Sequence, residues 1–333
     1  MRLAFRLILL TTLLGAVTGA QSIPKTVTLE VSGSSKVKSV EATYRRLGAR
    51  FLSFAWNRRD GELAAIDVTK NKLVVFPRDY FSNEEVRPRE IDTVETPLQV
   101  LWKPVGDRSY YVVFSKAKGA VACCDASTLK ETNRKQISDL RAIYGSNSAG
   151  DSRLYFQADT ELRAMRVPDL SGKELVSKVE SVLGVSADGR FVYVNVRNLH
   201  QRNQLHASVI RVQPEGFQTL LSRLRMPGEE FGHLDGSGGS IVTRKTVLSP
   251  RLAMRSTHEE LNFTPVFAFG RNWFVGLGNQ QNLVIGSSLT RVADIAYPPT
   301  IRRFPPDVEV AEIRYGRQSA CFFDTKESRL VVV

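Results

Sequence analysis

Histidines have the widest chemical range of any side chain here, and the chain has four of them. His233 and Asp235 stand two positions apart, so on a strand they would face the same side and could share a metal ion. A zinc site needs further protein ligands, and the neighbouring sequence supplies none. His233 and Asp235 are therefore candidate metal ligands. A structural calcium is the alternative, no other cofactor is evident, and catalytic residues remain unassigned.

Two further features can be read as chemistry or as structure. Residues Asp235–Ser240 are glycine-rich, but they lack the lysine and the strand–loop–helix context of a phosphate-binding loop. We interpret them as a connection between strands. Cys123 and Cys124 are adjacent on a predicted strand, so their side chains should point to opposite faces. With three cysteines in all, we expect small buried residues and no disulfide framework.

Tryptophans and paired arginines are the candidate binding residues. The tryptophans stand near the first strand of three predicted sheets, where they could frame a ring-binding surface or pack between sheets. The arginine pair could contact an anion or be a solvated loop. The candidates are Trp56, Trp102, Trp273, Arg302 and Arg303.

The elements that position these residues follow from an internal repeat. A strand, a tight turn and a second strand occupy Val185–Val194 (VSADGRFVYV), and weaker copies occupy 104–113 and 148–156. Glycines at the turns stand on average about 43 residues apart, which is the length of four short strands with their turns. They are Gly61, Gly106, Gly150, Gly189, Gly239, Gly270 and Gly316. The repeat predicts an all-β fold, a seven-bladed β-propeller, with six or eight blades as the alternatives.

The best copy of the repeat also carries a resemblance. Residues Ser186–Val194 resemble the S-P-D-G-[RK] turn of bacterial YVTN-type and TolB-like propellers, which are WD40-like, with Ala187 in place of the usual proline. The resemblance implies the fold of a secreted bacterial propeller. It implies no single activity, because propellers of this shape include binding proteins, lactonases, quinoprotein dehydrogenases and sugar lyases.

A second match links the two ends of the chain. Asp67 and Asp324 each end a strand, and a polar turn then leads to Leu-Val-Val. We expect each carboxylate to cap backbone N–H groups of its turn. The repeat is least regular around residues 240–262, where only Ser240–Thr243 reads as a strand and the outer strands of the fifth blade stay unassigned.

The first twenty residues have the pattern of a signal peptide. Arg2 and Arg6 precede an apolar run, Leu7–Leu14, and small residues then predict cleavage near Ala20. No later stretch approaches the ~20 apolar residues of a membrane-spanning helix. The sequence therefore predicts a secreted or periplasmic protein.

Residues 21–49 are predicted to close the ring. Thr26–Val31 alternates with the period of a strand, and we expect it to pair with the last blade, because an open sheet edge is a liability. Val37, Val40, Tyr44 and Leu47 recur at helical spacing, so the following segment is either a short helix or a plain link. Residues 50–333 carry the propeller repeats.

Charge limits the classes of partner. The chain has 46 basic and 34 acidic residues, a net charge of +12, or +10 once Arg2 and Arg6 are removed. Its basic clusters are not interleaved with aromatic residues, so we expect no specific nucleic-acid binding. The hypothesis is an exported, monomeric, non-catalytic module that binds a protein or an anionic cell-envelope polymer. The alternative is a lactonase- or lyase-like hydrolase with its site at the channel mouth.

Overall fold

The structure of the chain is a computed structural model, and it describes a defined set of residues. These are residues 25–32, 39–46, 49, 51–146, 148–172, 174–176, 179–186, 188–197, 205–213, 216–224, 231–234, 241–243, 246–249, 252–257, 263–269, 273–278, 283–287, 300–301, 310–315, 320–324 and 329–332. The described residues form β-strands and one short 3-10 helix, η1 (Arg78–Phe81). In this part of the chain no helix has the length and apolar character that a membrane crossing requires.

Five antiparallel sheets follow one another along the described chain, each built from four consecutive strands. The first sheet contains β3 (Phe51–Asn57), β4 (Glu62–Asp67), β5 (Lys72–Phe76) and β6 (Arg89–Ile91). The second contains β7 (Gln99–Val105), β8 (Arg108–Ser115), β9 (Ala120–Asp125) and β10 (Glu131–Gln136). The third contains β11 (Leu140–Gly145), β12 (Arg153–Ala158), β13 (Glu161–Arg166) and β14 (Glu174–Val176). The fourth contains β15 (Val179–Val185), β16 (Phe191–Arg197), β17 (Leu205–Gln213) and β18 (Gly216–Leu224). The fifth contains β19 (Phe231–Leu234), β20 (Ile241–Thr243), β21 (Thr246–Leu248) and β22 (Met254–Thr257).

The remaining described strands form one nine-stranded sheet that joins both ends of the chain. Its strand order is β23-β24-β25-β26-β1-β2-β29-β28-β27. The N-terminal strands are β1 (Lys25–Ser32) and β2 (Ser39–Arg46). The others are β23 (Phe263–Phe269), β24 (Trp273–Gly278), β25 (Leu283–Ser287), β26 (Thr300–Ile301), β27 (Val310–Tyr315), β28 (Ala320–Asp324) and β29 (Arg329–Val332).

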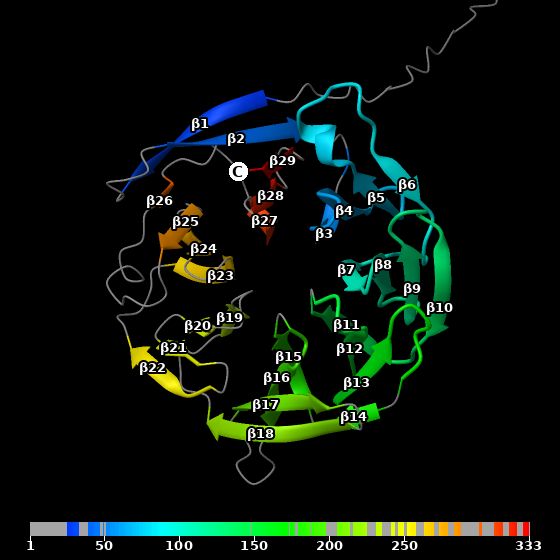
Figure 1. Ribbon diagram of the computed structural model, residues 1–333, viewed down its shortest axis with the longest axis vertical. Helices are drawn as coiled ribbons and strands as arrows, with labels where there is room; N and C mark the ends of the chain where they lie inside the picture. The colour runs from blue at the N-terminus through cyan, green and yellow to red at the C-terminus, as the bar shows by residue number, and fades with distance from the viewer. Residues whose placement is uncertain are drawn as a thin grey trace, which may run out of the picture.

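The sheets stand around a common centre, and the first strand of each four-strand unit lies innermost (Figure 1). Contacts join these inner strands in chain order, from β27 to β3, β7, β11, β15, β19 and β23. This radial arrangement of antiparallel four-stranded units is that of a β-propeller.

The hydrophobic core lies between neighbouring sheets. The middle strands of a sheet are covered on both faces, so β8 and β9 read as nearly continuous apolar runs. Cys124 packs with Ile66 in the cluster between the first and second sheets, while Cys123 packs with Leu154 between the second and third. The prediction of opposite faces is confirmed, and both cysteines are free. Burial raises the pKa of each thiol to about 12, so neither is a ready nucleophile.

The repeat of four short strands that the sequence predicts is present in the first four sheets, and the irregular fifth interval also forms a sheet, of short strands. Ser240–Thr243 corresponds to β20, and β19, β21 and β22 supply the strands that the sequence left unassigned. The alternating pattern of residues 292–296 also predicts a strand, but these residues lie outside the described part of the chain, and the strand that pairs with β25 is β26. Asp67 also behaves as predicted, because its Oδ1 accepts N–H bonds from Thr69 at 2.8 Å and Lys70 at 3.1 Å.

The prediction of which strand closes the ring was wrong in its details. Residues 39–46 form strand β2, not a helix, and β2 is the strand that pairs with β29, with Thr43 opposite Val332. The predicted closing strand lies one position further out, because β1 pairs with β2 and, at its other end, with β26. Val40, Ala42 and Tyr44 also alternate with polar residues, and the open edge of β29 selects this two-residue period over the helical one.

Arg45 fastens the closing strand β2 to the first sheet. Its side chain is buried, and its guanidinium carbon lies 3.9 Å from the centroid of the Tyr80 ring in η1. The guanidinium donates to the carbonyl of Tyr80 and, at 3.3 Å each, to the carbonyls of Asn83 and Glu84. One cation therefore satisfies three carbonyls of the loop between β5 and β6.

Replacing this buried cation should loosen the closure. We expect Arg45→Met to lower the free energy of unfolding by about 2–4 kcal/mol, because the loop carbonyls and the Tyr80 ring lose their cationic partner. Urea denaturation measures the change. The matched control is Arg108→Met at an exposed arginine, where we expect a change within about 0.5 kcal/mol. Equal effects of the two substitutions would show that Arg45 does not hold the closure.

Candidate functional site

The repeated turns of neighbouring sheets contact one another at one end of the strands. Arg59, in the turn between β3 and β4, donates to the carbonyls of Asp107 and, at 2.8 Å, Gly106. Gly106 in turn donates its N–H to the Ala149 carbonyl of the next sheet at 2.8 Å. The Tyr155 hydroxyl donates to the Gly189 carbonyl of the fourth sheet at 3.2 Å. We call this chain of contacts the turn belt.

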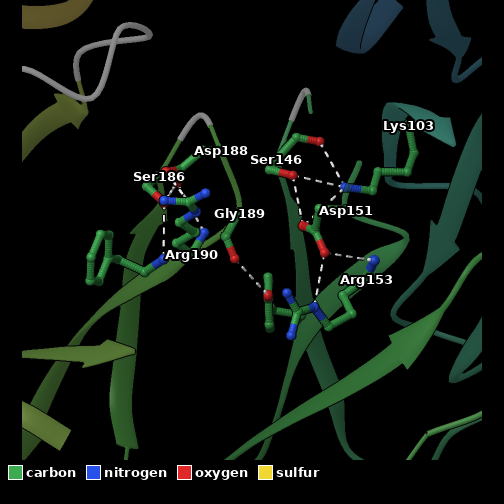
Figure 2. A network of polar contacts seen from close by, with 10 residues as sticks. Lys103, Ser146, Asp151, Arg153, Ser186, Asp188, Gly189 and Arg190 are labelled. Atoms are coloured by element: carbon green, nitrogen blue, oxygen red, sulfur yellow. Dashed lines mark hydrogen bonds and ion pairs between the residues drawn. The ribbon is translucent and has the colours of Figure 1, made fainter. Parts of the chain in front are cut away.

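Gly189 shows why the belt needs glycine in its best turn. Its φ is +73°, and a Cβ added there would lie 2.1 Å from Oδ2 of Asp151. A side chain would therefore collide with the carboxylate of the neighbouring sheet as well as strain the backbone. Asp188 caps the same turn, since its Oδ1 accepts the Arg190 N–H at 3.0 Å and the Ser186 hydroxyl at 2.6 Å. Figure 2 shows the turn that contains Asp188 and Gly189 beside the connection that contains Asp151.

The belt encloses a buried cluster of Lys103, Ser146 and Asp151 (Figure 2). Lys103 belongs to β7 of the second sheet, whereas the other two belong to the connection between β11 and β12 of the third. Lys103 Nζ lies 3.0 Å from the carbonyl oxygen and 2.9 Å from the hydroxyl of Ser146, and 3.3 Å from Asp151 Oδ2. Ser146 donates to Asp151 Oδ2 at 2.8 Å, and Arg153 donates to Oδ1 at 2.9 Å.

Burial dominates the electrostatics of this cluster. The Lys103 side chain is 0% exposed and that of Asp151 is 4% exposed. Burial lowers the pKa of Lys103 to about 8, and the Asp151 carboxylate opposes that shift. An amine of lowered pKa beside a hydroxyl could in principle serve acid–base chemistry. Enclosure between two sheets gives the cluster a different role, which is to join the second sheet to the third through hydrogen bonds and an ion pair.

Sequence reasoning missed Lys103 and Ser146 as a unit. Asp151 lies in the weaker repeat copy at residues 148–156, which predicts a turn there, and its partner Lys103 stands 48 positions earlier. A signal did exist, because Lys103 interrupts the apolar strand Gln99–Val105 directly after Trp102. A lysine in such a strand requires a buried partner.

The structure describes the side chains of two predicted binding residues, and each packs with a different apolar cluster. Trp102 is buried in the core cluster between the first and second sheets, and Trp56 packs against the cluster around Phe76 and Tyr80. Both positions correspond to the packing alternative. Of Trp273 and His233 the structure describes only the backbone, in β24 and β19.

The remaining candidates are not tested. Asp235, Arg302 and Arg303 lie outside the described residues. Among the described residues, no group of three or more His, Cys, Asp or Glu side chains could hold a metal ion. The metal and arginine assignments therefore stay predictions.

An open groove lies at the opposite end of the strands from the turn belt. Three adjoining pockets of about 630, 390 and 230 Å³ share Ser138 in the link between β10 and β11, and together we call them the Ser138 groove. The second and third sheets form its walls. The charged residues that line it are Lys116, Lys118, Lys135, Asp139, Arg141, Asp159, Glu161 and Arg163.

Close backbone contacts fix the shape of the groove. Gly119 has a φ of +56°, and a Cβ there would lie 2.6 Å from the carbonyl oxygen of Ile137. The turn between β8 and β9 therefore packs directly against the link that contains Ser138. Asp139 and Asp159 both have positive φ, and the Asp159 N–H donates to the Asp139 carbonyl at 3.1 Å. The groove is thus built from turns that hold one another in place.

Some charged side chains of the groove have ion-pair partners among the described residues, and others do not. Lys118 pairs with Glu95 at 2.7 Å, and Arg141 and Arg163 pair with Asp159 and Glu161. Pairs as exposed as these contribute at most about 1 kcal/mol each, so a ligand can exchange with them. Within the described part of the chain, no hydrogen bond or ion pair reaches the Lys116 ammonium or the Asp139 carboxylate. Both of these free charges line the same pocket.

Comparison with known proteins shows the fold alone. No family model matches the chain, and no curated protein matches it in sequence. Among solved structures, hydrazine synthase from Kuenenia stuttgartiensis is similar, with a TM-score of 0.63 and 9% identity over 86% of this chain and 95% of that one.

Two further structures show how varied the neighbours are. The β-propeller domain of Cps50 (Swd1) from Myceliophteria thermophila gives a TM-score of 0.59 and 11% identity, covering 85% of this chain and 96% of that one. A catalytically inactive virginiamycin B lyase from Staphylococcus aureus, solved with quinupristin, gives 0.58 and 9% over 93% and 99% of the two chains. The chain therefore has a β-propeller fold that enzymes and other proteins share.

Breaking the buried ion pair should destabilise the joined sheets. We expect Lys103→Met to lower the free energy of unfolding by about 3 kcal/mol, because Asp151 loses its fully buried cation and keeps only the partly exposed Arg153. Combining it with Asp151→Asn should cost less than the sum of the two single changes. Urea denaturation of the four proteins measures this, with the exposed Lys116→Met as the control. Additive losses would contradict the coupling.

The lowered pKa of Lys103 also predicts a pH dependence. Lys103 titrates near pH 8 in the folded chain and near 10.5 when unfolded, so between these values the unfolded chain binds the proton more tightly. The unfolding free energy should therefore rise from pH 8 towards pH 10.5 in the wild type relative to Lys103→Met. Denaturation at a series of pH values measures the difference. A difference that stays constant across this range would rule out titration of Lys103.

Proposed function

We propose that this protein is an exported, monomeric, seven-bladed propeller that acts as a non-catalytic binding or scaffold module for a protein or an anionic polymer. The Ser138 groove is the observation that carries the proposal. It is open, its shape is fixed by its backbone, and it presents charges that the described residues leave unpaired. The buried Lys103 cluster, by contrast, is enclosed by two sheets.

The count of seven rests on how the described strands divide. Five four-stranded sheets come first, and the nine-stranded sheet separates at β1 into two further units of four strands. One unit is β23 to β26, and the other is β27 to β29 completed by β2. β1 pairs with β26 on one side and with β2 on the other, so it connects these last two units.

Export and the class of partner rest on sequence. Arg2, Arg6 and Leu7–Leu14 support cleavage near Ala20. The repeat Ser186–Val194 supports a bacterial relative of the YVTN type. A net charge of +10 after removal of Arg2 and Arg6 supports attraction to anionic surfaces outside the cell.

The mature chain tests this proposal through its salt dependence. We expect protein recovered from the culture medium to begin at Gln21 and to be retained on polygalacturonate beads at low ionic strength. At about 1 M salt the Debye length falls to about 3 Å, and the protein should elute. Retention that does not change with salt would exclude the electrostatic attraction. A chain that keeps residues 1–20 and stays in the cell would exclude export.

A further inference from the structure

The lining of the Ser138 groove distinguishes between the two classes of partner. Acidic side chains stand among the basic ones, and Asp139, Asp159 and Glu161 would face any bound chain. Arg141 and Arg163 already pair with Asp159 and Glu161, so the carboxylate that would meet an uncompensated like charge in a uniformly anionic polymer is Asp139. A polypeptide can carry charges of both signs within one short segment, so it can match both the basic and the acidic side chains of the groove.

Two free charges give the groove a polarity. Lys116 projects from the turn between β8 and β9, and Asp139 from the link between β10 and β11; both are exposed. Neither is neutralised by a described partner, unlike Lys118, Arg141 and Arg163. A ligand that carries both a carboxylate and a cation could form an ion pair with Lys116 and with Asp139 at the same time.

We propose that the Ser138 groove binds an extended segment of a partner protein that carries an acidic residue for Lys116 and a basic residue for Asp139. This inference rests on the proposed function and selects its protein partner. The pocket of about 630 Å³ accommodates a few side chains, which is the scale of a short linear segment. Because the groove is held by turn-to-turn contacts, binding requires little reordering of the propeller.

Charge exchange in the groove tests the proposal. A displayed library of random short peptides is selected on the full mature chain, with the Lys116→Glu, Asp139→Asn double variant as the counter-selection target. Asn suits position 139 because it tolerates the positive φ there. We expect enriched peptides to contain one acidic and one basic residue. Each single variant should weaken binding about two- to fivefold, as the loss of an exposed ion pair does.

Matched variants at the opposite end of the strands keep the test specific. Lys130→Glu and Asp107→Asn change the same charges at exposed positions outside the groove and should leave peptide affinity unchanged. Unaltered melting temperatures verify that all variants fold. Enrichment of purely acidic peptides whose binding improves with Asp139→Asn would overturn the inference in favour of an anionic polymer.

Two other outcomes would reject peptide binding in the groove without rejecting the proposed binding function. Peptides that bind the groove variants as tightly as the wild type would overturn the groove assignment, while binding at another surface would sustain a binding module. Absence of any enrichment over the double variant would also overturn the inference. Retention on polygalacturonate would then still support the proposed function.

Discussion

The second and third sheets each have two apolar faces, and that constraint organises the rest of the described structure. A strand such as Ala120–Asp125 buries side chains on both sides, so its sheet is stable only between two neighbours. A linear stack would leave its first and last faces in water, whereas a ring covers all of them. The two cysteines at 123 and 124 illustrate the point, since each belongs to a different interface.

Apolar packing alone would let neighbouring sheets slide, and the polar contacts at the strand ends prevent this. Hydrophobic burial is non-directional, but the bonds among Lys103, Ser146 and Asp151 form at one relative position of two sheets. A buried ion pair gains little net free energy over apolar packing because desolvation offsets its attraction. Its contribution is therefore better understood as registration of one sheet against the next, with the Gly189 turn seated on the same carboxylate.

The sequence predicted the features that depend on local pattern. The repeat of short strands was predictable because glycine turns recur at the length of four strands, and the Asp67 cap followed from turn chemistry. Pairing between distant segments was not predictable in the same way. Tyr44 fits both a helical and a strand period, and only the edge of β29 decides between them. Likewise, the Ser138 groove exists only where connections from two sheets meet, so no single segment signals it.

The position of β2 has a consequence for how the chain is made. Residues near the start pair with residues near position 332, so the ring remains an open arc until nearly all of the described chain has been synthesised. Contacts of such long sequence separation form late and slowly. In the meantime the edges of β2 and of the newest sheet are unpaired, and unpaired edges are the surfaces on which chains aggregate. Folding of such a protein requires that its early strands do not aggregate before β29 is available. This favours keeping the chain extended or protected until its last strand has been synthesised.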